Sequence, residues 1–306
     1  MGGALRSVGG VSHSAVEFLA GRLTDHVSVG LLAAAVPRVV IDDAVAEFGK
    51  GAKRSDAKLA AQVMVYFAMA MALFADEDCQ EVLTRLAEVL KDWGRWDAGW
   101  ECPGSGGITQ ARERLGADVV REVFERVAQP VAGMLARGAW LAGGRMVSID
   151  GFEWDVPDSE ANAEFFGYAG SGANRSAFPK MRVVEYEVPD RGTDGERELF
   201  CLPTTLLDAR CAPAALLAAG YHERWEHEQA NAQAKTVPRG PGKVMRSQSP
   251  DMVLQELYGY LLTHYAINSL ICQAATEADI DPDRVEFTNA VRVIRRRIDD
   301  PAAFSP

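Results

Sequence analysis

The strongly apolar run Val63–Phe74 (VMVYFAMAMALF) most constrains how this chain can fold. It is too short to span a bilayer, and the acidic residues Asp76, Glu77 and Asp78 follow it closely. A helix that is hydrophobic all round is typical of the core of a large protein domain. The run therefore predicts a buried helix and no membrane association.

Helical spacing of apolar residues extends over the first part of the chain. It predicts an all-helical N-terminal domain over residues 14–138. The clearest segments are Ala15–Leu23, Ala57–Ala75, Gln80–Leu90 and Val119–Leu135.

A short helix–turn–helix-like pair is expected around Gly116, with Val119–Val127 as its second helix. Ser105, in the loop Gly104–Gly107, is expected to cap a first helix that begins near Ile108. Two interpretations stay open for this pair, a DNA recognition helix or an ordinary helical hairpin with exposed arginines. The polar residues concerned are Gln110, Arg112 and Arg114.

The pattern changes at Ala139, where short strands begin to alternate with loops and helices. A short apolar strand, Met146–Ile149, ends at Asp150, and residues 162–174 are expected to form a loop. Residues 139–306 therefore indicate a second, mixed α/β domain. The further strands expected are Phe152–Val156, Val183–Val188 and Glu198–Leu206, and the further helices are Pro213–Lys235, Asp251–Thr276 and Asp283–Arg297.

The charge of the chain argues against a nucleic-acid-binding protein, because the net charge is −11 and the isoelectric point is near 5.0. Basic residues nevertheless cluster in residues 224–246 and again in residues 292–297. Such clusters are either DNA-binding surfaces or solvated helix faces.

Five cysteines are present, an odd number, and no two of them have the C-x-x-C spacing of a zinc site. The histidines lack metal-ligand spacing as well. This usage predicts buried thiols in a protein of the reducing cytoplasm.

Tyr221, Arg224, Glu228 and Lys235 stand at positions i, i+3, i+7 and i+14. On a helix this spacing places all four side chains on one face. A carboxylate flanked by two cations and an aromatic ring suits a metal ion beside a DNA phosphate and an unstacked base. The alternative is an exposed, salt-bridged helix face.

The spacing Y-x2-R-x3-E-x6-K resembles the signature of DDE transposases of the insertion-element-four type. The phrases FADEDCQEV and ITQARERLG are similar to the N-terminal helical domain of that family. Asp150-Gly151 with Asp155-Val-Pro-Asp158 resembles its first catalytic strand and hairpin. Residues 201–208, 221–235 and 239–247 resemble the segment that carries its catalytic glutamate.

The resemblance implies a ribonuclease-H-like sheet and cut-and-paste transposition of an insertion sequence by two-metal phosphoryl transfer. Asp150 and Glu228 would be catalytic residues and ligands of Mg2+ or Mn2+. The DNA partner would be the terminal inverted repeats of a transposon, and the residues that contact it would be Tyr221, Arg224, Lys235, Arg239 and Arg246.

One departure from the family lies near residues 182–183, where the stretch that holds the second catalytic Asp is missing, as after an in-frame deletion. Asp190-Arg191-Gly192 could replace it, but its position after Pro189 is typical of a solvated turn. We therefore expect a truncated ribonuclease-H-like domain without catalysis, with Asp251–Arg297 packed over the gap. The alternative is a DNA-binding regulator that forms homodimers, or heterodimers with intact transposase, and inhibits it.

Overall fold

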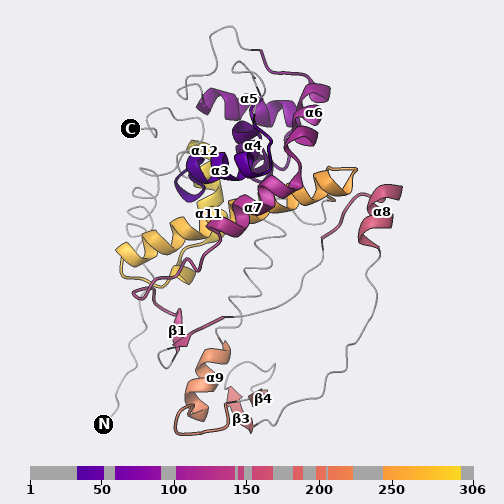
Figure 1. The fold of residues 1–306 in the computed structure, drawn as a ribbon. Coiled ribbons are helices and arrows are strands. Elements are labelled where there is room, and N and C mark those ends of the chain that lie inside the picture. The colour runs from indigo at the N-terminus through magenta and orange to yellow at the C-terminus, as the bar shows by residue number, and fades with distance from the viewer. Residues whose placement is uncertain are drawn as a thin grey trace.

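The computed structural model of this protein consists mostly of helices, with two small two-stranded sheets among the residues it describes (Figure 1). The described residues are 33–51, 59–90, 101–141, 144–147, 154–167, 182–188, 198–204, 206–222 and 244–297.

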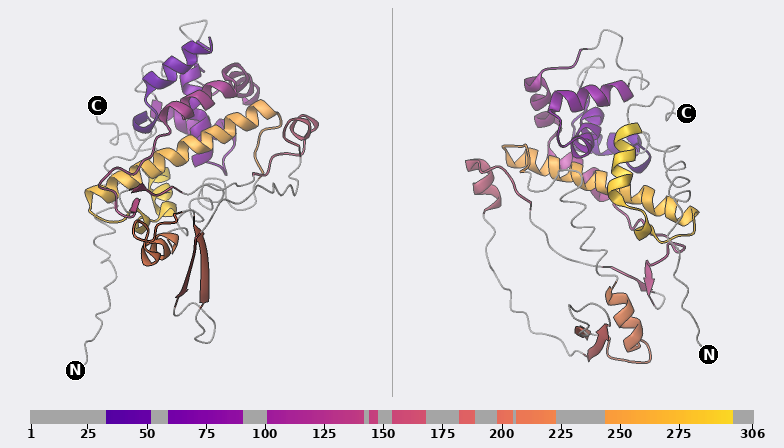
Figure 2. Two further views of the ribbon diagram at one scale, coloured as in Figure 1. Left: turned by 60° about the horizontal axis from the view of Figure 1, so that its bottom comes forward. Right: turned by 180° about the vertical axis from the view of Figure 1, so that it is seen from behind.

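A helical core brings together elements from both ends of the chain (Figures 1 and 2). The long helix α11 packs against α4 and α7, and α12 packs against α11. The helices of this core are α3 (Arg38–Glu47), α4 (Ala61–Leu73), α5 (Cys79–Leu90), α6 (Ser105–Leu115), α7 (Ala117–Val127), α11 (Pro250–Glu277) and α12 (Phe287–Arg297).

The buried helix predicted from the apolar run is confirmed as α4, in which every residue from Met64 to Leu73 is buried. Its one phenolic hydroxyl is satisfied, because Tyr66 Oη donates to the carbonyl of Val36 at 2.8 Å. Burial also raises the pKa of Tyr66 well above its usual value. Among the described residues, no helix combines the length and the apolarity that a membrane span requires.

The helices of the predicted hairpin, α6 and α7, differ in part from the predicted bounds. The helix α6 begins at Ser105, and its N-cap is Gly104, whose carbonyl accepts from the amides of Gly107 and Ile108. Ser105 is therefore the first helical residue and not the cap. The second hairpin helix ends at Val127, as predicted for the hairpin, and does not continue over the apolar spacing to Leu135, because Pro130 has no N–H and disfavours helical backbone before it.

The C-terminal helices belong to the helical core. The expectation that Asp251–Arg297 pack over an incomplete sheet stays a prediction. Leu262, Ile267 and Leu270 of α11 are buried in one cluster with residues of α4 and α7. The last predicted helix is divided into a 3-10 turn, η2 (Pro282–Arg284), and α12. The helical core thus draws on both of the domains that the sequence suggested.

The strand pair β3 (Arg182–Val188) and β4 (Glu198–Thr204) confirms two of the predicted strands. The strands are antiparallel, with Val184 opposite Leu202. Val184 is buried, whereas Glu185 and Glu187 are exposed, as the alternating pattern predicted. Pro203 is tolerated because β4 has a partner on one side among the described strands.

The structure describes Met146 and Val147 of the strand predicted at Met146–Ile149, and neither residue is in a strand. The structure has the short pair β1 (Trp140–Leu141) and β2 (Gly144–Arg145) before them. Residues 154–156 are not a strand either. The larger ribonuclease-H-like sheet stays a prediction.

A short helix, α8 (Glu160–Phe166), occupies residues that we expected to form a loop. Ser159 caps this helix by accepting from the amide of Asn162 at 3.3 Å. Gly167 ends the helix with a φ of 68°. The composition of residues 162–174, rich in Gly, Ala and Asn, favoured a loop although Ser159 is a good N-cap residue.

Candidate functional site

Most of the residues that the sequence predicted as functional lie outside the described residues. They are Asp150, Asp190, Arg224, Glu228, Lys235 and Arg239. The structure describes Tyr221 and Arg246, which stand close to the two ends of the undescribed residues 223–243.

Tyr221 is half-buried in α9 (Ala214–His222), which begins the helix predicted from Pro213. Leu217 of α9 is buried against Val184 of β3 and Ala212. A Cβ on Gly220 would come within 2.8 Å of a Leu141 methyl, so α9 lies directly against β1. These contacts position the first residue of the predicted signature.

On the other side of the undescribed residues, Met245 is bound to the segment that follows Asp150. The amide of Met245 donates to the carbonyl of Asp155 at 3.0 Å. Met245 is buried with Val253 and Tyr260 of α11, and the Trp154 ring meets Tyr260 edge-on at 5.1 Å between centroids. The two flanks of the predicted carboxylate segments therefore lie side by side.

The same two flanks are joined again at α8. Ser159 Oγ donates to the carbonyl of Gln248 at 2.8 Å. Asn162 is 1% exposed, and its Nδ2 donates to the carbonyl of Pro157 at 3.0 Å and to that of Ser247 at 3.5 Å. Residues 154–162 and 245–248 thus form one hydrogen-bonded unit.

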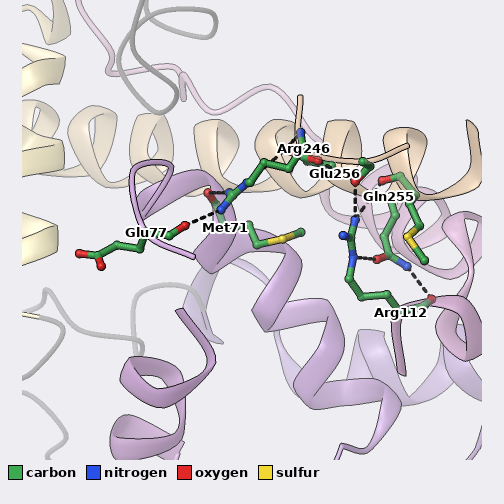
Figure 3. A network of polar contacts seen from close by, with 8 residues as sticks. Met71, Glu77, Arg112, Arg246, Gln255 and Glu256 are labelled. Atoms are coloured by element: carbon green, nitrogen blue, oxygen red, sulfur yellow. Dashed lines mark hydrogen bonds and ion pairs between the residues drawn. The ribbon is translucent and has the colours of Figure 1, made fainter. Parts of the chain in front are cut away.

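Arg246 is directed into the helical core (Figure 3). Its Nη1 donates to the carbonyl of Glu77 at 2.9 Å, and its Nη2 donates to that of Met71 at 2.6 Å. Its Nε lies 3.7 Å from Oε1 of Glu256, whose side chain is 1% exposed. The DNA contact predicted for Arg246 stays a prediction, but the structure gives this side chain an internal role that its sequence neighbourhood did not reveal.

Arg112 is buried in the same network, and this overturns the interpretation of the hairpin arginines as all exposed. Its Nε donates to Gln255 Oε1 at 2.9 Å (Figure 3). Its Nη2 donates to Ser247 Oγ at 2.9 Å. Burial lowers the pKa of Arg112, while the Glu256 carboxylate opposes that shift. Gln110 and Arg114 on the same helix are exposed.

Helix ends in the core are capped by side chains of residues 246–255. Gln255 Nε2 donates to the carbonyls of Arg112 at 3.0 Å and Gly116 at 3.2 Å, at the end of α6. Asp251 Oδ1 accepts from the amide of Ala117 at 3.1 Å, at the start of α7. Unpaired backbone groups at helix ends need such partners when they are buried.

The outer face of α7 carries no excess of positive charge. Arg121 pairs with Glu125 at 2.7 Å, and Arg126 pairs with Glu122 at 2.8 Å and also with Glu47. The Arg121–Glu125 pair is exposed, so it contributes little to stability, whereas Arg126 and Glu122 are half-buried. The basic side chains on this face of α7 are therefore balanced by acidic partners, and the recognition helix proposed for α6 stays a prediction.

Of the second basic cluster, in α12, the structure describes the side chains of Arg292 and Arg295. Arg292 is exposed and donates to Asn289 Oδ1 at 3.3 Å. Arg295 is half-buried, and burial lowers its pKa. The α12 helix packs through Phe287, Val291 and Ile294.

The described residues hold no group of three or more His, Cys, Asp or Glu side chains that could bind a metal ion. The predicted ligands Asp150 and Glu228 lie outside that part of the chain. All five cysteines are described and are free thiols, but the prediction that they are buried is wrong except for Cys272.

Residues 26–125 match a family model described as the N-terminal region of insertion element 4 transposase. The transposase InsG of insertion sequence element IS4, from Escherichia coli strain K12, is 28% identical over 127 residues, which are 42% of this chain and 27% of InsG. InsZ of the same organism, named provisionally as a transposase, is 33% identical over 90 residues, which are 29% of this chain and 30% of InsZ. This chain thus spans less than a third of either relative. No solved structure matches it.

Proposed function

We propose that this chain, a member of the insertion element 4 transposase family by its residues 26–125, binds the terminal inverted repeats of an insertion sequence and does not cleave them. The match of residues 26–125 carries the proposal. Both similar proteins from Escherichia coli are transposases by name.

The DNA-binding part of the proposal concerns an end-binding segment, defined as residues 221–243. Arg224, Lys235 and Arg239 in this segment would bind phosphates of the DNA, and Tyr221 would stack on an unstacked base. The support from the structure is that α9 leads into this segment and that Met245 directly follows its end.

The loss of cleavage follows from the carboxylates that the chain offers. Asp150 and Glu228 would supply oxygen donors of the kind that Mg2+ prefers, and bound Mg2+ would activate a water or a 3′ hydroxyl for attack on phosphorus. By its resemblance to the family, the chain lacks the stretch near residues 182–183 that would hold the second catalytic Asp, and Asp190 belongs to a sequence typical of a polar turn. Two carboxylates offer less negative charge than two divalent ions need.

The pairing of residues 154–162 with residues 245–248 supports a common site. Asp150 stands four residues before Trp154, and the end-binding segment finishes just before Val244. The hydrogen bond from the Met245 amide to the Asp155 carbonyl, 3.0 Å long, therefore joins the flanks of the two segments that carry Asp150 and Glu228.

The test uses the purified full chain, labelled DNA with the inverted repeats that flank its gene, and a scrambled DNA of equal length. We expect a salt-sensitive gel shift that the scrambled DNA competes poorly. With Mg2+ or Mn2+ present, we expect no more nicking than with a Glu228→Ala variant.

Nicking above the Glu228→Ala control would contradict the loss of catalysis. The absence of any shift with the repeats would contradict DNA binding. A shift without nicking is also the behaviour expected of an inhibitor that competes with intact transposase for the same ends.

A further inference from the structure

We propose that Arg246 is a positioning residue, which fixes the flank formed by residues 244–249 on the helical core and does not itself bind DNA phosphate. The inference rests on the proposed function for what the end-binding segment does. It concerns a residue that the sequence had suggested as a direct DNA contact.

Each of the three guanidinium nitrogens of Arg246 has a partner in the protein. Both Nη atoms donate to backbone carbonyls, those of Met71 in the last turn of α4 and Glu77 just after that helix. A guanidinium at a helix C-terminus is also favoured by the helix dipole. A phosphate that pulled the guanidinium away from these bonds would leave two carbonyls without their donor.

The Glu256 side chain contacts the backbone of the flank as well as the Arg246 side chain. Oε1 of this buried carboxylate accepts from the amide of Arg246 at 3.3 Å, and Oε2 accepts from Ser247 Oγ at 2.8 Å. Ser247 Oγ in turn accepts from Arg112 Nη2 at 2.9 Å. We call these side chains, Arg112, Arg246, Ser247 and Glu256, the anchor.

The anchored flank also holds the segment that follows Asp150. Met245 is bound to Asp155, and Gln248 is bound to Ser159. A shift of the flank would therefore change the end-binding segment and the Asp150 segment together. Arg246 should thus influence DNA binding through position and not through charge.

The test compares Arg246→Gln with Lys235→Gln in the full chain, by measuring Kd for the inverted-repeat DNA over a range of salt concentrations. Loss of one phosphate contact reduces the magnitude of the slope of log association constant against log salt concentration by about 0.9. We expect this reduction for Lys235→Gln. For Arg246→Gln we expect binding weakened at least about fivefold at every salt concentration with an unchanged slope. Arg246→Lys, which keeps the charge but cannot reproduce the bonds of the planar guanidinium, should not restore the affinity.

For Glu256→Gln, a charge effect and a positioning role predict changes of opposite sign in DNA affinity. If charge alone acted, removal of this carboxylate would tighten DNA binding, whereas the positioning role predicts weaker binding. The double variant Arg246→Gln/Glu256→Gln should lose less than the sum of the two single losses, because both act on one anchor.

Amide hydrogen exchange of residues 244–249, measured without DNA, tests the anchor independently of the proposed DNA binding. We expect faster exchange in Arg246→Gln and in Glu256→Gln, and a smaller increase in Ser247→Ala, which serves if the other two do not fold. A slope whose magnitude falls by about 0.9 in Arg246→Gln, restored affinity in Arg246→Lys, or unchanged exchange would overturn the positioning role. If the unaltered chain does not bind the DNA, the proposed function fails, and the exchange result still decides whether the anchor exists.

Discussion

At the scale of single residues, Arg112 has a role set by partners far away in the chain. Replacement by Leu would remove donors from Gln255 Oε1, Ser247 Oγ and the carbonyl of Met252. Breaking a buried ionic network by removing one partner costs about 3–5 kcal/mol. We therefore expect Arg112→Leu to lower the free energy of unfolding by about that amount, measured by urea denaturation followed by circular dichroism.

The matched control is Arg114→Leu, two residues further along α6 at an exposed position. It should change the free energy of unfolding by no more than about 0.5 kcal/mol. Equal losses in the two variants would show that the burial of Arg112 does not matter to stability.

His264 is a second residue whose surroundings set a measurable property. Burial lowers its pKa from 6.5 to about 4. The unfolded chain therefore binds more protons than the folded chain between these values, so stability is complete above pH 6.5 and falls as the pH drops toward 4. The loss should approach about 3 kcal/mol.

The measurement compares urea midpoints of the unaltered chain and His264→Gln at several pH values from 7.5 to about 4.5. Since carboxylates titrate in both proteins, the difference between the two isolates His264. The stability difference between them should shrink as the pH falls. A constant difference would rule out the burial effect.

At the scale of secondary-structure elements, the packing of α11 on α4 depends on a close backbone approach. A Cβ on Gly259 would lie 2.4 Å from the carbonyl oxygen of Ala68 and 2.7 Å from its carbon. Backbone atoms cannot move aside as a flexible side chain can, so Gly259→Ala must separate the two helices. We expect thermal unfolding to show a loss of about 1–3 kcal/mol.

Gly106→Ala is the matched helical control, because nothing lies within 4 Å of a Cβ at Gly106 in α6. Alanine favours helix over glycine by up to about 1 kcal/mol, so this variant should be neutral or more stable. Stabilisation by Gly259→Ala as well would mean that α11 and α4 are not in such close contact.

At the scale of the whole molecule, the helical core is built from residues at both ends of the described chain. Truncation after Ser249 removes α11 and α12, which exposes α4 and deprives α6 and α7 of the caps from Gln255 and Asp251. We expect the truncated chain to lose its cooperative unfolding transition and to bind the dye ANS.

A chain that lacks residues 182–222 is the comparison, because it loses β3, β4 and α9 but keeps the helical core. Its transition midpoint should change by no more than about 4 °C, which corresponds to about 1 kcal/mol. Similar losses in the two shortened chains would contradict a core formed by the helices alone.

The sequence alone was sufficient for the elements whose own pattern is strong. The apolar run predicted α4, the long periodic segment predicted α11, and alternation predicted β3 with its buried Val184. The motif resemblance was confirmed over residues 26–125. Each of these signals depends on residues close together in the chain, where side-chain spacing directly reports which face is apolar.

The tertiary structure decided which polar groups are buried and what satisfies them. Arg112 and Arg114 look alike in sequence, but the first bonds to Gln255 and Ser247 in the core and the second is exposed. Residues more than a hundred positions apart supply those partners. A local pattern contains no information on such partners, because the buried environment of a charged group exists only once α11 has packed onto the N-terminal helices.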